Sequence, residues 1–73
     1  MTKLPVCSGE AAVRAFQRAG WTWARQRGSH VSLVKADSAV VLTVPLQREL
    51  GPGLLRSLIR KAGLTVEEFR ALL

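Results

Sequence analysis

The stretch WTWARQRGSHVSLVKADSAVVLTV, residues 21–44, decides the fold. It contains three runs rich in apolar and β-branched residues, and such runs are typical of strands. The runs cover 21–26, 30–34 and 39–44, and turn-like sequences at 27–29 and 35–38 separate them. Because short connections join antiparallel neighbours, this stretch predicts a three-stranded antiparallel meander.

The outer two runs carry more detail. In the first run Trp21, Trp23 and Arg25 alternate with their neighbours, so we expect these three side chains on one side of the strand. The third run is almost wholly apolar, which favours a central strand or one covered on both faces. Pro45 ends that run, because proline has no N–H to donate to a neighbouring strand.

Helical patterns flank the meander. Ser8 is a good N-cap and Gly20 a good C-terminal residue, and the apolar residues between them have helical spacing. A second helix is expected to open at Gly51-Pro52 and to close at Gly63. Residues 65–68 fit a capping box that begins a short last helix, whose apolar residues fold back onto the core.

The predicted order is therefore α-β-β-β-α-α. This order indicates an α+β sandwich, with the helices on one face of a three-stranded antiparallel sheet. The double-stranded-RNA-binding domain (dsRBD) has the related order α-β-β-β-α, so the expected fold is dsRBD-like. At 73 residues, we expect the chain to form one domain over 1–73. A domain of this size has no room for a deep cleft, so its site is expected to be shallow or completed by a partner.

The charge of the chain indicates its partners. The net charge is +6, and residues 11–35 contain five cations and no acid. Such a field attracts polyanions: nucleic acid, an anionic membrane surface or an acidic protein. No stretch reaches the ~20 apolar residues of a membrane span, and residues 1–10 contain no apolar signal core. With a single cysteine besides, we expect a cytoplasmic protein that does not act at a membrane.

The one histidine, His30, follows a Gly-Ser turn at the start of the second run. If that strand alternates, Val31 and Leu33 face the core and His30 faces the less buried side. RNA cleavage without metal needs a base, an acid and cations that neutralise the phosphorane, and histidine suits the first two roles. Three cations near His30 suit the last role: Arg25, Arg27 and Lys35. Composition alone leaves the alternative of an ordinary surface histidine.

The sequence contains few residues suited to other kinds of catalytic or binding site. One His and one Cys do not make a zinc site, and the five acids are scattered. The chain has neither a P-loop nor a dinucleotide-binding motif, so no metal and no cofactor are expected. Cys7 is interpreted as a packing residue. The pair Trp21 and Trp23 would suit stacking on bases if exposed, but the scarcity of aromatic residues favours packing in the core or against a partner.

Several motifs, in this order and spacing, resemble those of the HicA toxins, also called YcfA-like proteins. They are Leu4-Pro5, Ser8-Gly9-Glu10, Ala19-Gly20, the stretch 25–31, Val44-Pro45, Glu49-Leu50 and the stretch 53–64. The resemblance covers nearly the whole chain, from Leu4 to about Phe69. It implies a small mRNA interferase of a toxin–antitoxin pair with a dsRBD-like fold. It also implies that the catalytic histidine is the one in the Gly-Ser-His turn, here His30, and that a HicB antitoxin covers the active face.

One position departs from the resemblance. Many HicA toxins carry a second histidine in a Val-Pro-x-His pattern, and Gln47 stands there in this chain. Glutamine hydrogen-bonds phosphate but does not titrate, so this protein is expected to be a slower enzyme. Gln47 and Lys3 are therefore secondary candidates for contacting RNA.

Three hypotheses follow. In the first, the protein is a ribonuclease toxin in which His30 is the general acid or base, and Arg25, Arg27 and Lys35 bind phosphate. Gly28 then lets the RNA backbone come close, and Ser29 orients it.

In the second hypothesis, the protein is a non-catalytic module that holds structured RNA or a partner protein. In the third, the basic face exists only for an acidic partner. We expect the free protein to be a monomer.

Overall fold

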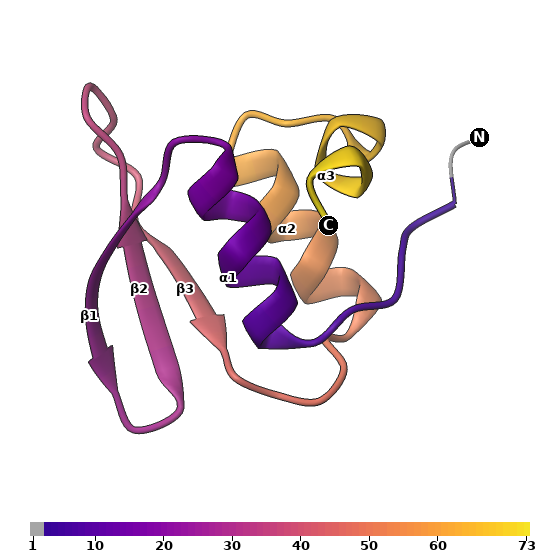
Figure 1. Ribbon diagram of the computed structural model, residues 1–73, viewed down its shortest axis with the longest axis horizontal. Helices are drawn as coiled ribbons and strands as arrows, with labels where there is room; N and C mark the ends of the chain where they lie inside the picture. The colour runs from indigo at the N-terminus through magenta and orange to yellow at the C-terminus, as the bar shows by residue number, and fades with distance from the viewer. Residues whose placement is uncertain (1–2) are drawn as a thin grey trace.

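The computed structural model describes residues 3–73 and confirms the predicted order of elements. The elements are α1 (Gly9–Arg18), β1 (Thr22–Arg27), β2 (His30–Val34), β3 (Leu42–Pro45), α2 (Pro52–Lys61) and α3 (Val66–Leu72). The strands form one antiparallel sheet in the order β1-β2-β3. Figure 1 shows the three helices gathered on one side of this sheet. The α+β class and the antiparallel meander predicted from the sequence are therefore correct.

The third strand differs from the prediction in length and in place. It covers Leu42–Pro45 instead of 39–44, and it lies at the edge of the sheet, not at its centre. A local turn takes up the backbone of the missing part, because the Val40 N–H donates to Ser38 Oγ at 3.1 Å. Val40 and Val41 are consequently exposed. The run is apolar because Leu42 and Val44 are buried, not because the strand is covered on both sides.

A β-bulge in β1 overturns the expected alternation. Trp23 lies opposite Leu33 and Arg25 lies opposite Ser32, so Ala24 is an extra residue between them. Trp23 therefore faces the helix side with buried Leu33, whereas Arg25 faces the open side. The expectation that Trp23 and Arg25 share a face was wrong. Trp21 lies outside the strand and is buried.

The core lies between the helices and the covered face of the sheet. Its fully buried side chains include Phe16 of α1, Val31 and Leu33 of β2, Leu55 of α2 and Phe69 of α3. The rings of Phe16 and Phe69 pack with their centroids 5.1 Å apart. The capping box of α3 forms as predicted: Glu68 N donates to Thr65 Oγ1, and Thr65 N donates to Glu68 Oε1. The last helix therefore folds back onto the first, as expected from its apolar residues.

The start of α1 lies directly against the chain that follows β3. Gly9 N donates to Gln47 O at 2.8 Å, and a Cβ built on Gly9 would overlap Pro45 O and lie 2.8 Å from the Leu46 Cα. Leu46 N in turn donates to Ser29 O at 2.7 Å, in the turn between β1 and β2. These contacts hold the residues after β3 beside that turn, at one end of the sheet.

Within residues 3–73, no helix is both long enough and apolar enough to cross a membrane.

Candidate functional site

The candidate site is built on the two-residue turn that joins β1 to β2. Gly28 has φ +58°, a left-handed conformation that glycine adopts without strain and that suits tight hairpins. Ser29 completes the turn, and exposed His30 is the first residue of β2. The turn is held from two sides, because Gln26 Nε2 donates to Gly28 O at 2.9 Å and Leu46 N donates to Ser29 O. His30 therefore starts its strand from a well-supported backbone.

Two arginines share the open face of the sheet with His30. Arg27 lies directly opposite His30, and Arg25 lies opposite Ser32. Opposite residues of an antiparallel pair point to the same face, with Cβ atoms about 4.5–5.5 Å apart. Because Val31, between His30 and Ser32, is fully buried, this shared face is the one turned away from the core. All three charged or titratable side chains are exposed, so the site is a shallow basic surface.

The structure does not bring Lys35 to this surface. Lys35 follows the far end of β2, five residues from His30, which corresponds to about 16 Å along a strand. Its Nζ lies 5.9 Å from the centroid of the Trp21 ring, over which it sits as a cation–π partner. Lys3 is exposed in the segment before α1, and within residues 3–73 no hydrogen bond joins it to His30.

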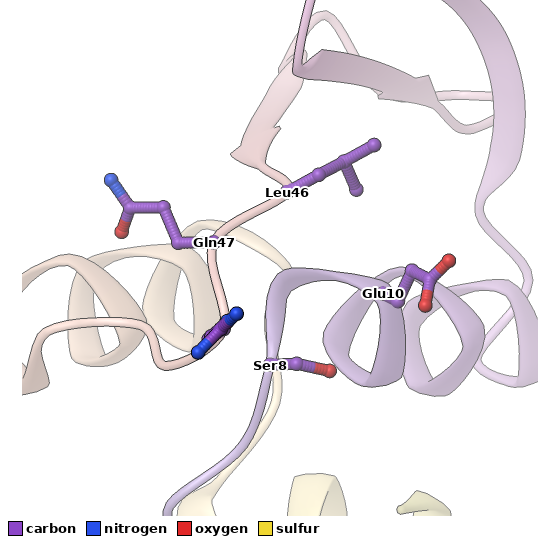
Figure 2. A pocket seen from close by; sticks show the side chains of 5 residues that line it. Ser8, Glu10, Leu46 and Gln47 are labelled. Carbon is purple, nitrogen blue, oxygen red and sulfur yellow. The ribbon is translucent and has the colours of Figure 1, made fainter.

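Gln47 lines a second feature beside the turn, a pocket of about 440 Å³ at the start of α1. Its lining residues are Ser8, Glu10, Leu46, Gln47 and Arg48. Figure 2 shows the Gln47 amide and the Glu10 carboxylate pointing to opposite sides of this pocket. Gln47 follows Pro45, the β3 residue opposite His30, by two positions. It therefore lies near the candidate site in the chain that the Leu46–Ser29 hydrogen bond holds in place.

Sequence reasoning missed two residues near the turn. Gln26 supports the turn through its side-chain amide, but its place could not be read before the register of β1 was known. Arg48 adds a cation to the pocket beside Gln47. Its position directly after Gln47, where the resemblance already drew attention, was the available signal.

The remaining nucleophile and the possible metal ligands lie elsewhere. Burial raises the pKa of the Cys7 thiol, which keeps it protonated at neutral pH and therefore a poor nucleophile. Residues 3–73 hold no group of three or more His, Cys, Asp or Glu side chains placed to share a metal ion. The arrangement around His30 offers one imidazole for proton transfer and two guanidinium groups for an anionic substrate.

The sequence of the chain is similar to that of a known protein family. The family described as HicA toxin of bacterial toxin–antitoxin matches residues 9–64, which is well over half of the chain. The match includes the sheet, the turn before His30 and α2, and it ends before α3. No curated protein matches the chain.

Proposed function

The chain belongs to the HicA toxin family, and we propose that it is a metal-independent mRNA interferase in which His30 transfers protons. Membership makes it a toxin of a toxin–antitoxin pair; the ribonuclease activity and the residues that carry it are the proposal. The observation that supports it most is the cross-strand group of His30, Arg25 and Arg27 on the open face of the sheet. It combines the titratable group and the cations that RNA cleavage requires.

The reaction would proceed through attack of a 2′-hydroxyl on the adjacent phosphorus. The 2′-hydroxyl loses its proton, and its oxygen forms a bond to phosphorus. The bond from phosphorus to the 5′-oxygen of the next nucleotide breaks, and that oxygen gains a proton. The His30 imidazole would accept the first proton, and the imidazolium that this forms would donate the second. Acid–base catalysis by one such group contributes ~10²–10⁴-fold to the rate.

The arginines would bind the reacting phosphate. Each guanidinium presents two N–H groups in the geometry of two phosphate oxygens. Gly28 has open space around its Cα, so an RNA backbone can approach the turn there, and Ser29 would orient it. Lys35, Gln47 and Lys3 would contact RNA farther from the reacting phosphate. Lys35 has this outer role because it lies at the far end of β2.

The partner of the open face would be a HicB-type antitoxin. The face is uncovered in the free chain and its cations attract acidic groups, so an antitoxin that covers it would also block His30. We propose that the free toxin is a monomer that acts on mRNA in the cytoplasm.

The test compares induced expression of the natural protein with that of His30→Ala. We expect the natural protein to stop growth and fragment mRNA, and the variant to do neither at equal soluble expression. The purified protein should cleave RNA in the presence of EDTA. Arg70→Ala, a loss of charge on α3, serves as the control and should remain toxic. A His30→Ala variant that still fragments mRNA would refute the assigned role.

One observation favours a second candidate, a non-catalytic RNA-binding module. Within residues 3–73, the His30 imidazole has no hydrogen-bond partner that would orient it, whereas catalytic bases are often held by a third group. If the protein is a binding module, the purified protein should retain RNA, and the length of the bound RNA should stay constant with time.

A further inference from the structure

A groove of about 300 Å³ runs between α1 and β1, on the helix side of the sheet. Trp23 and Gln26 line it from β1, and Val13, Arg14 and Gln17 line it from α1. The volume lies at the lower end of the range for small-molecule pockets. The groove lies outside the face that carries His30, and the proposed reaction leaves it unused.

Trp23 is the unusual member of this groove. Its partner across the ladder, Leu33, is fully buried, whereas Trp23 is 43% exposed. The bulge at Ala24 places the indole here, because strict alternation would have put it on the open face with Arg25. Its exposed ring therefore forms a flat apolar wall beside α1.

The polar side chains of the groove are available to a ligand. Within residues 3–73, Glu10, Arg14 and Gln17 form no side-chain hydrogen bond or ion pair. Together with the Trp23 ring, they offer what an unpaired nucleobase requires. Such bases stack on aromatic rings or on guanidinium planes, and they hydrogen-bond through their exposed edges.

The groove is connected to the candidate site by two hydrogen bonds. Gln26, from the groove, donates to Gly28 O at 2.9 Å, and Leu46, at the groove's end, donates to Ser29 O at 2.7 Å. Gly28 and Ser29 are the two residues directly before His30. Gln26 and Leu46 therefore place one end of the groove beside the turn that precedes His30, on the opposite face of the sheet, and an RNA strand held at His30 would reach it around the edge of β1.

We propose that this groove is a nucleobase subsite that holds one unpaired base of the RNA substrate, stacked on Trp23. The inference rests on the proposed function and adds a substrate class: single-stranded RNA, although the order of elements resembles that of a double-stranded-RNA-binding domain. A base inside a duplex is paired and stacked, so it cannot turn into the groove. Trp23 then acts as a residue that determines which RNA is bound.

The test measures binding with the His30→Ala protein, which keeps the RNA intact. The probe is a short unstructured RNA, together with a series in which one base at a time is removed to leave an abasic nucleotide. With Trp23 present, removal of one particular base should weaken binding roughly 5- to 150-fold, the effect of one aromatic–base stack. With Trp23→Leu the same removal should have little effect, and Trp23→Phe should restore part of it. Val41→Ala, on another exposed apolar residue, serves as the control.

Tryptophan fluorescence gives a second readout. Trp21 is only 4% exposed, so quenching by a stacked base is expected to come from Trp23 alone. The unstructured RNA should quench the emission and a fully paired RNA duplex should not. Equal sensitivity to base removal with Trp23 and with Trp23→Leu would overturn the proposal. So would unchanged RNA binding by Trp23→Leu together with lost inhibition by the antitoxin, since the groove would then belong to a protein partner.

The binding test of the nucleobase subsite is independent of whether the protein cleaves RNA. If the protein with His30 intact fails to cut RNA but the effect of base removal depends on Trp23, the interferase proposal fails and the subsite stands. If cleavage requires His30 but base removal has the same effect in both proteins, the interferase proposal stands and the subsite fails.

Discussion

At Gly9 the start of α1 lies directly against the end of β3. A methyl group on the Gly9 Cα would overlap Pro45 O, and the backbone on both sides leaves no flexible side chain to move away. We expect Gly9→Ala to lower the free energy of unfolding by about 1–3 kcal/mol, the usual cost of overpacking. Urea denaturation followed by circular dichroism measures this. Gly53→Ala is the matched control, because Gly53 lies in α2 with open space around it and should gain about 0.4–1 kcal/mol. Equal effects at both glycines would contradict the close contact.

Cys7 illustrates a second property that depends on a single residue. Burial raises the pKa of its thiol, so the protonated form is favoured in the folded state. The buried thiol therefore contributes its full share to the free energy of unfolding below the pKa of the unfolded thiol, about 8.5. That contribution decreases as the pH rises above this value. We expect iodoacetamide at pH 8 to alkylate the folded protein much more slowly than the protein in urea. Equal rates would show that the thiol is accessible.

At the scale of the element, α3 depends on its cap. The Thr65 hydroxyl accepts from Glu68 N, and the Glu68 carboxylate accepts from Thr65 N, so two N–H groups at the helix start are satisfied. Thr65→Ala should cost about 1 kcal/mol of stability, and Thr65→Ser should retain most of the cap. Urea midpoints of the three proteins test this. A loss for Thr65→Ser as large as for Thr65→Ala would show that the hydroxyl is not what matters.

Elements with local signals were the ones that could be predicted from the sequence. Ser8, Gly63 and the Thr65–Glu68 pair mark helix ends through contacts within a few residues, so the helices and their order were predicted correctly. The bulge at Ala24 depends on pairing with β2, and no residue type in β1 predicts it. The turn that shortens β3 depends on Ser38 capturing the Val40 N–H in competition with the sheet.

In the candidate site too, the residues placed by local sequence could be predicted, and those placed by contacts between distant segments could not. His30 and Arg27 flank a two-residue turn, so their neighbourhood follows from the turn alone. Lys35 is near His30 in sequence, but an extended strand carries it away. Gln26 and Leu46 support the turn through contacts that only the register and the folding back of the chain after β3 create.

At the scale of the whole molecule, the distribution of charge should determine how RNA binding depends on salt. For single strands, the slope of log K against log salt is about −0.7 for each phosphate neutralised. Arg25→Gln or Arg27→Gln, in the His30→Ala protein, should therefore reduce the slope by roughly 0.7 each. Arg70→Gln removes the same charge from α3 and should leave the slope unchanged. Binding measured over a series of NaCl concentrations tests this, and equal changes for all three arginines would mean that RNA does not prefer the open face.

The edge of the sheet at β1 has a consequence for solubility. Strand β1 pairs only with β2, so its outer backbone N–H and C=O groups face solvent in the described part of the chain. Open edges of this kind join to one another and lead to aggregation, and charged side chains on the edge oppose this. Arg25 and Arg27 therefore keep copies of the protein apart in addition to any role in holding RNA. A chain in which both are replaced by glutamine would lose this protection and precipitate at concentrations where the natural protein stays dissolved.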